Sequence, residues 1–268
     1  MKRIVKNVNH FTSASTLAAS TAELEVERIY ANEWLKFLMF FNRVHNYSTR
    51  NIVRIFLQRP DATMVANSDV WAKAGRKIKR GEKGIKILSP VIVGKGRPMR
   101  YETSYVFDVS QTYGNALPKY RWNDEAFCNL QEPETLLAVL QKISPCPMFL
   151  DKDWDKGEIN GYFDTKSKEI HIKCTGRSEE AILRSTIHEV VHARMHQHSS
   201  LNRAAKEIQS ESVTFIVLNH FGYKKHFSLS REYIAGWAGQ MPNTDLVDNL
   251  LAIGNEAKKL IAAIEAEL

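Results

Sequence analysis

The sequence lacks the features that mark secreted, membrane-spanning and disulfide-stabilised proteins. Its 268 residues include three cysteines, Cys128, Cys146 and Cys174, and none forms a C-x-x-C pair, which argues against a disulfide framework and a cysteine zinc site. No apolar run approaches the length of a membrane span. Met1-Lys2-Arg3 is basic, but Val5–Asn9 is too short and polar for a signal-peptide core. We therefore expect a cytoplasmic protein with no membrane partner.

Composition and charge indicate a folded chain with two unlike halves. Apolar residues make up 44% and charged residues 25%, as in globular proteins, and the length suits one large domain or two ordinary ones. Residues 1–120 contain 20 Lys and Arg against 9 Asp and Glu, a net charge of +11, whereas residues 121–268 have a net charge of −4. This asymmetry favours two domains and a polyanionic partner for the first.

One stretch contains a metal-binding motif. Residues 178–198 carry apolar side chains at helical spacing without proline or glycine, and within them His188-Glu189-Val190-Val191-His192 is an H-E-x-x-H motif. Residues four apart lie on one helix face, so both imidazoles can bind one metal ion and Glu189 can take a proton from a bound water. The alternative is two ordinary helix histidines and a solvated glutamate. His196 and His198 are expected to be surface histidines.

A third ligand is available in the next predicted helix, residues 206–217. Glu207 and Glu211 are four apart and share a face of a helix that is apolar from Val213 onward. One carboxylate can complete a site of two histidines and one glutamate, and the other can orient a ligand imidazole. Spacing alone leaves open which acid does which. Two solvated glutamates in a first helical turn are the simpler alternative.

The remaining pattern predicts an α+β chain. A helix is expected over residues 21–44, and Ser48 is expected to cap a second helix, Thr49–Gln58. A short helix at 68–75 precedes a strand, a glycine-flanked turn and another strand over 76–87, with further strands at 88–93 and 101–109. After Pro133 we expect helices at 134–143, 230–236 and 244–268, and a hairpin of Glu158–Asp164 with Glu169–Lys173. Strand Glu169–Lys173 is expected to offer an edge to an extended peptide.

A dense group of cations lies in the first half. Seven Lys and Arg fall within fourteen residues, which favours salt-sensitive binding to phosphates, and nearby Trp71 and Tyr47 can stack on bases as in single-strand binders. The alternative is a solvated basic hairpin with Trp71 buried. The cations are Lys73, Arg76, Lys77, Lys79, Arg80, Lys83 and Lys86.

Two stretches resemble known families. His188-Glu189-x-x-His192 with Glu207-x-x-x-Glu211 resembles gluzincin metallopeptidases, including the ImmA/IrrE-like group, although the segment between His192 and Glu207 is short. Residues 20–113 resemble the single-stranded-DNA-binding domain of ArdC-type antirestriction proteins. That match rests on His45–Ser48 with Asn51, Gln58–Thr63, Trp71, Gly75-Arg76, Lys79–Ile85 and Phe107–Thr112.

The resemblance implies one zinc ion, with other divalent metals as alternatives, held by His188, His192 and Glu207, with Glu211 bracing a ligand and Glu189 as general base. It implies that single-stranded DNA binds the first half and that the protein shields incoming DNA of mobile elements from restriction. The expected DNA-binding residues are Asn46, Tyr47, Asn51, Trp71, Arg76, Lys77, Lys79, Arg80, Lys83 and Lys86.

These observations predict four segments: a flexible arm (1–20), a DNA-binding domain (21–114), a linker (115–133) and a zincin-like domain (134–268). The favoured hypothesis is an antirestriction protein with a peptidase-like zinc site. The alternatives are a metallopeptidase that cleaves a repressor or restriction enzyme, and a non-catalytic DNA-binding adaptor in conjugative transfer.

Overall fold

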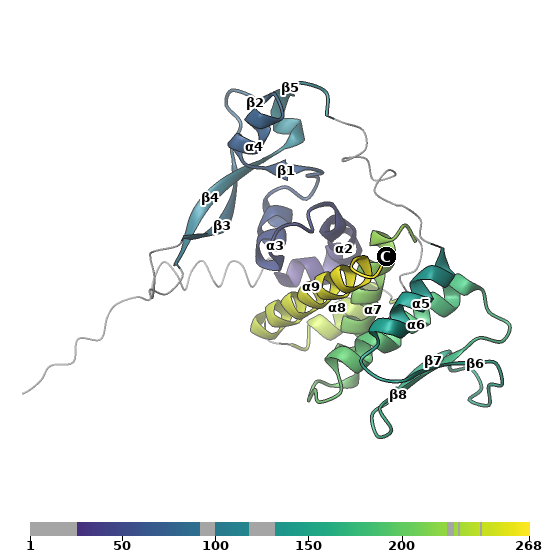
Figure 1. Cartoon of the computed structure of the whole chain (residues 1–268). Coiled ribbons are helices and arrows are strands. Elements are labelled where there is room, and N and C mark those ends of the chain that lie inside the picture. The colour runs from purple at the N-terminus through teal and green to yellow at the C-terminus, as the bar shows by residue number, and fades with distance from the viewer. Residues whose placement is uncertain (1–25, 92–99, 118–131, 224–227, 230, 242) are drawn as a thin grey trace, which may run out of the picture.

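The computed structural model describes residues 26–91, 100–117, 132–223, 228–229, 231–241 and 243–268 (Figure 1). Helices predominate, and the described strands form three small sheets, which confirms the α+β prediction. No helix in these ranges is long and apolar enough to cross a membrane. The predicted arm and most of the predicted linker lie outside the described residues.

The first half begins with apolar helices. A π-helical turn, η1 (Ile29–Glu33), runs directly into α2 (Trp34–Arg43), and α3 (Thr49–Gln58) follows. The Ser48 side chain accepts a hydrogen bond from the backbone N–H of Asn51, so the predicted cap and the predicted bounds of this helix are confirmed. The start expected near residue 21 lies outside the described residues.

The strands of the first half form two antiparallel sheets. One has the order β1-β4-β3, and the other pairs β2 with β5. The strands predicted within 76–87 are present as β2 and β3, but they belong to different sheets, and residues 79–84 cross between them. The elements are β1 (Val65–Ala66), α4 (Ser68–Lys73), β2 (Arg76–Ile78), β3 (Ile85–Val91), β4 (Arg100–Asp108), η2 (Val109–Gln111) and β5 (Thr112–Gly114).

The second half opens with α5 (Pro133–Ile143) and a sheet of order β6-β8-β7. The predicted hairpin is confirmed as β7 (Gly161–Asp164) with β8 (Glu169–Lys173). Strand β6 (Met148–Asp151), which was not predicted, pairs with β8 in parallel. Strand β8 is thus central, and the expectation that it offers a free edge is wrong.

In the described residues after β8, four helices follow: α6 (Glu179–Met195), α7 (Arg203–His220), α8 (Arg231–Ala238) and α9 (Asn243–Glu265). Strand β8 buries Ile170 and Ile172, both with no exposed surface, in the same core as Leu183 and Ile187 of α6. Figure 1 shows the β6-β8-β7 sheet beside α6, with α7 and α9 between it and the N-terminal helices.

Buried side chains from both halves form one continuous apolar core. Polar contacts also join the halves: the Tyr30 hydroxyl donates to the carbonyl of Leu246 at 3.2 Å, and Thr49 donates to Asn255 Oδ1 at 2.8 Å. The predicted domain boundaries remain a prediction. The described parts of the two predicted domains, residues 21–114 and 134–268, pack against each other in this core.

Candidate functional site

Helices α6 and α7 carry the residues of the H-E-x-x-H prediction. Each helix is preceded by an N-cap residue whose side chain accepts a hydrogen bond from a backbone N–H of the first turn. Ser178 Oγ accepts from the N–H of Ala181 in α6, and Asn202 Oδ1 accepts from the N–H of Ala205 in α7. The caps fix where each helix starts, and the 3.6-residue period then sets which side chains face the partner helix.

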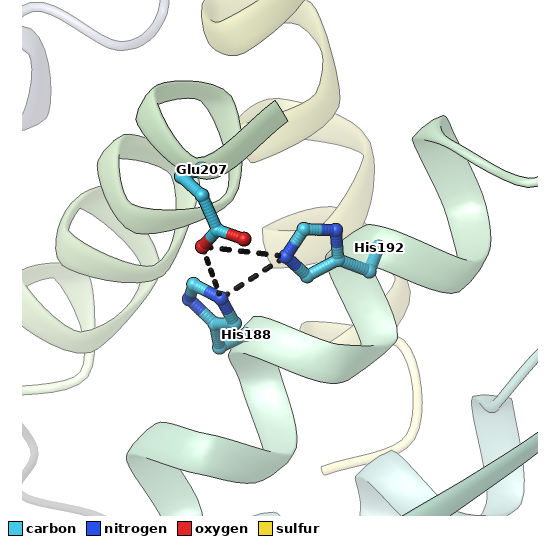
Figure 2. A group of neighbouring side chains, drawn as sticks. All are labelled: His188, His192 and Glu207. Carbon is cyan, nitrogen blue, oxygen red and sulfur yellow. Dashed lines mark hydrogen bonds and ion pairs between the residues drawn. The ribbon is translucent and has the colours of Figure 1, made fainter. Parts of the chain in front are cut away.

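Three side chains converge between these helices (Figure 2). The Nε2 atoms of His188 and His192 lie 3.1 Å apart, and Glu207 Oε2 lies 3.4 Å from the first and 3.8 Å from the second. Within the described part of the chain, this is the group of His, Cys, Asp and Glu ligand atoms close enough to hold one metal ion. Two imidazole nitrogens and a carboxylate are the donor set of a catalytic zinc site with one position left for water.

The electrostatics of these three groups suit a cation. Burial by itself lowers the pKa of His188, but hydrogen bonds to Glu207 and Glu211 outweigh it and raise that pKa to about 9. The two histidines in turn hold the pKa of the Glu207 carboxyl well below its usual range, so this carboxylate is ionised at neutral pH. Carboxylates that stabilise a proton on an imidazole would also stabilise a divalent ion at the same place.

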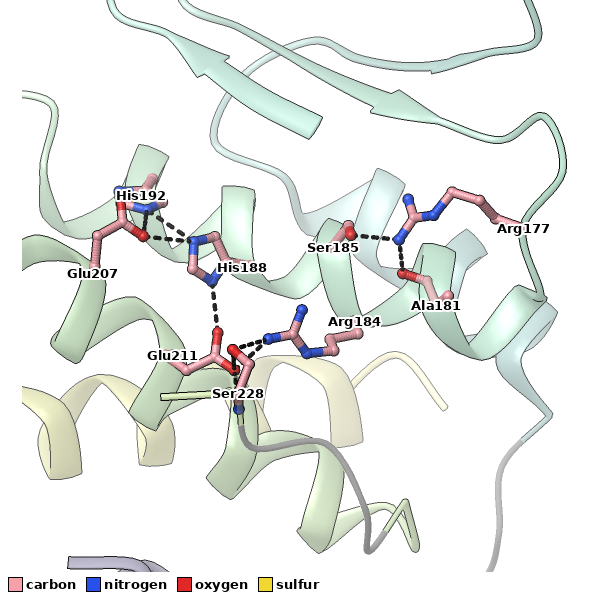
Figure 3. Close-up of polar contacts among 9 residues, drawn as sticks. All are labelled: Arg177, Ala181, Arg184, Ser185, His188, His192, Glu207, Glu211 and Ser228. Carbon is pink, nitrogen blue, oxygen red and sulfur yellow. Dashed lines mark hydrogen bonds and ion pairs between the residues drawn. The ribbon is translucent and has the colours of Figure 1, made fainter. Parts of the chain in front are cut away.

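The second nitrogen of His188 faces Glu211, which is 3% exposed (Figure 3). His188 Nδ1 lies 3.3 Å from Glu211 Oε2, while the other carboxylate oxygen accepts from Arg184 and from the backbone and hydroxyl of Ser228. Burial raises the pKa of Glu211, but these partners outweigh it and lower it to about 2. Glu211 is therefore placed to orient His188 and to keep its proton on Nδ1.

A parallel arrangement holds His192. Its Nδ1 lies 3.0 Å from Nδ1 of His196, whose Nε2 lies 2.8 Å from Gln209 Oε1. Burial lowers the pKa of His196 to about 4, so this ring is neutral at pH 7. Because the amide oxygen only accepts, His196 carries its proton on Nε2 and accepts from His192 Nδ1. This leaves the lone pair of His192 Nε2 directed at the candidate metal position.

The prediction that His196 is a surface histidine is wrong, since its exposed fraction is 5%; His198 is exposed as expected. The spacing in the sequence is consistent with this placement, because His188, His192 and His196 repeat every four residues and so share one helix face.

Glu189 lies between the candidate metal ligands and β7. Its carboxylate accepts a hydrogen bond from the Phe163 backbone N–H, and burial raises its pKa above the ordinary value while His188 and His192 oppose that rise. Gly161 of β7 lies next to the Glu189 side chain, because a Cβ built on this glycine would lie 3.4 Å from Glu189 Cγ. A cavity of about 230 Å³ opens here, lined by Gly161, Glu189, His188 and Glu207 among others.

Three of the predicted DNA-binding residues make contacts inside the protein. Trp71 is 2% exposed and its Nε1 donates to the carbonyl of Phe107 at 2.9 Å, so the prediction that it stacks on bases is wrong. Asn51 uses both ends of its amide on the backbone of Leu88, at 2.8 and 3.0 Å. Tyr47 packs against the core and donates to the carbonyl of Val65. The three side chains stabilise the fold of the first half.

The predicted cations are placed around β2 and β3. Arg76 is half-buried and donates to the side chain and carbonyl of Thr112, while Lys79 donates to the carbonyl of Ser110. Among the described residues, no carboxylate lies within ion-pair distance of the seven cations. The exposed members of the predicted set are Asn46, Lys77, Lys79, Arg80, Lys83 and Lys86.

Comparison with known proteins identifies the fold. No family model matches the chain. An uncharacterised protein of Bacillus anthracis is 24% identical over 286 aligned positions, which cover 88% of this chain and 48% of that protein, so the chain spans about half the length of this relative. The crystal structure of the Mn(II)-bound antirestriction ArdC protein from plasmid R388 is 16% identical, with a TM-score of 0.63 over 91% of this chain and 97% of that one. Its metal-free structure gives a TM-score of 0.62. The chain has the ArdC fold, as the sequence resemblance implied.

Proposed function

We propose that this chain is an antirestriction protein of the ArdC type that binds single-stranded DNA and contains a metal-dependent, peptidase-like centre. The DNA-binding role falls to residues 21–114 and the metal centre to residues 134–268, in the cytoplasm. The observation that carries the proposal is the convergence of His188, His192 and Glu207 beside Glu189, in a chain with the ArdC fold over nine-tenths of its length.

A single divalent cation would be held by His188 Nε2, His192 Nε2 and Glu207. The donor set fits such an ion, because the Nε2 atoms of both imidazoles converge on one point beside an ionised carboxylate, and a cation bound there would replace the proton that His188 otherwise holds. Two nitrogens and one oxygen favour zinc, whereas the solved ArdC structure holds Mn(II). Metal analysis of protein purified without chelators distinguishes the two.

The reaction would be hydrolysis of a peptide bond, with the cation supplying Lewis-acid activation of water and carbonyl. Glu189 accepts the proton of the attacking water and then delivers it to the leaving amine. Its raised pKa suits both transfers, because a carboxyl that titrates closer to neutrality takes up and releases a proton more readily. A purely structural metal site has no need of this carboxylate.

Strand β7 supplies the place for an extended substrate. In the described part of the sheet, β7 is an edge strand, and its Gly161 and Phe163 lie against Glu189. A peptide that paired along this edge would pass the carboxylate and the cavity. The protein substrate proposed is a repressor or a restriction enzyme.

The deciding experiment is transfer of unmodified DNA into a restricting host that expresses the wild-type protein, Glu189→Gln or Glu158→Gln. Glu158 lies in an exposed loop and is the matched control. We expect protection by the wild type and the control, and loss with Glu189→Gln at unchanged metal content.

Retained protection by Glu189→Gln would favour a second candidate function. In this function the first half protects the DNA by binding to it and blocking access, and the metal centre has a structural role. The exposed cations favour that candidate. Absence of protection by the wild type would contradict the antirestriction proposal. The remaining hypothesis would then be a non-catalytic DNA-binding adaptor in conjugative transfer.

A further inference from the structure

Exposed tyrosines are concentrated on the sheets of the first half. The described residues include four strongly exposed tyrosines, and three of them lie here: Tyr101 and Tyr105 on β4, 62% and 51% exposed, and Tyr113 on β5, 55% exposed. Exposing a large aromatic ring to water is unfavourable, so a cluster of such rings on one region indicates a binding surface.

Two of these tyrosines are paired with exposed lysines across their strands. In the β3–β4 ladder Lys86 is directly opposite Tyr105, and in the β2–β5 ladder Lys77 is directly opposite Tyr113. Residues directly opposite in an antiparallel pair project from the same face of the sheet. Each ribbon therefore presents one lysine beside one tyrosine on its exposed face.

The orientation of Tyr105 is fixed by packing. The residues next to this pair, Ile85, Ile87 and Val106, are buried, so Lys86 and Tyr105 must project from the opposite face. Gly84 lies against the tyrosine, because a Cβ at this position would meet Tyr105 Cβ at 2.9 Å and Phe107 Cζ at 3.1 Å. A glycine at position 84 thus leaves room for the Tyr105 side chain where it lies.

The surrounding charge selects the ligand. Lys73, Lys79, Arg80 and Lys83 are exposed around the two ribbons, in addition to the paired lysines. Flat aromatic rings interleaved with cations fit a single nucleic-acid strand, whose bases stack on the rings while the cations contact its phosphates. A duplex hides its base faces inside the helix and offers the rings no partner.

We infer that Tyr105 and Tyr113 are the base-stacking residues of a single-stranded-DNA site, and that Lys86 and Lys77 contact the adjacent phosphates. This inference rests on the proposed function and assigns to these residues the stacking role that the sequence suggested for Trp71 and Tyr47. The site lies on the outer faces of the β3–β4 and β2–β5 ribbons.

The test compares binding of the full-length protein to a labelled oligothymidylate and to an abasic oligonucleotide of the same length and charge. The wild type should bind the oligothymidylate more tightly. Tyr105→Ala and Tyr113→Ala should each weaken binding to the oligothymidylate by about tenfold, since each removes one stacked base, and should leave binding to the abasic strand unchanged. Tyr105→Phe and Tyr113→Phe should restore binding, which also shows that the ribbons fold.

Tyr233→Ala is the matched control, since Tyr233 is an exposed tyrosine on α8. Equal binding of both oligonucleotides by the wild type, or alanine variants that bind oligothymidylate as the wild type does, would overturn the stacking site and leave the DNA-binding function in place. Failure of the wild type to bind either strand at low salt would overturn the DNA-binding function itself.

Discussion

At the scale of single residues, the candidate metal site depends on which ring nitrogen carries each proton. Gln209 and His196 impose one tautomer on His192, and Glu211 does the same for His188. Outer contacts of this kind raise metal affinity because the ligand atoms are already oriented before the ion arrives.

Replacing His196 should therefore weaken metal binding. His196→Ala removes the acceptor for His192 Nδ1, and we expect metal affinity to fall by about 10- to 100-fold. Competition with a chelating dye measures the affinity. His198→Ala, which alters an exposed histidine two residues later, is the control and should match the wild type. Equal affinity in both variants would refute an orienting role for His196.

In the first half of the chain, the Asp108 carboxylate holds several backbone N–H groups in place. This carboxylate, 2% exposed, accepts from the backbone N–H groups of Thr63, Met64 and Ser110 at 2.8, 3.0 and 2.9 Å. Burial raises its pKa, but these hydrogen bonds and one from the Ser110 hydroxyl outweigh it, so the pKa of Asp108 is lowered. The contacts tie the segment before β1 to the end of β4.

Asp108→Asn should lower the free energy of unfolding by about 2 kcal/mol or more at neutral pH, because one charged acceptor of several bonds is removed. A lowered pKa in the folded state means that the unfolded chain takes up the proton first as the solution is acidified. The contribution of Asp108 is therefore complete above the ordinary aspartate pKa of about 3.9 and is lost as the pH falls through the lowered value. Urea unfolding of both proteins at a series of pH values measures it: the difference should shrink below about pH 4.

At the scale of elements, the close approach of α9 to the N-terminal helices joins the two halves. Gly254 of α9 lies against them, because a Cβ at this position would clash with Thr49 Cγ2 and lie 2.8 Å from Phe41 Cε2. The neighbouring atoms belong to a buried aromatic ring and a β-branched side chain, so neither moves aside easily.

Gly254→Ala should thus destabilise the protein by about 1–3 kcal/mol through overpacking, although alanine favours a helix by about 1 kcal/mol over glycine. Gly236 in α8 is the matched control, since nothing lies within 4 Å of a Cβ built there, and Gly236→Ala should be neutral or stabilising. Chemical denaturation of both variants checks this. A Gly254→Ala protein as stable as Gly236→Ala would show that α9 does not approach the first half this closely.

At the scale of the whole molecule, charge is divided between the two halves of the chain. The first 120 residues have a net charge of +11 and the rest −4. Binding to a polyanion should therefore depend on the first half and weaken with salt, because each neutralised phosphate releases counterions.

Arg80→Glu with Lys83→Glu should weaken binding to single-stranded DNA and flatten its salt dependence by about 0.7 in log–log slope for each phosphate that the variant no longer neutralises. Lys152→Glu with Lys166→Glu makes the same change in net charge at exposed positions of the second half. Retardation assays across a salt series compare the pairs. Equal weakening by both pairs would mean that net charge, and not the basic surface around β2 and β3, governs binding.

The sequence alone determined the features that depend on neighbours a few residues apart. The cap at Ser48, the helix with His188 and His192 on one face, and the β7–β8 hairpin follow from local hydrogen bonds and from periods of 3.6 and 2 residues. The α+β class and the uneven charge are likewise properties of the chain before it folds.

Only the tertiary structure decided what depends on packing between distant elements. The positions of Glu207 beside the two Nε2 atoms and of Glu211 beside Nδ1 follow from how α7 lies against α6, and spacing permitted either order. Pairing with β6 made β8 central, burial removed Trp71 from the surface, and α7 covered His196. Local periodicity specifies which face of an element a residue occupies, whereas the partner of that face is chosen by the burial of apolar surface across the whole chain.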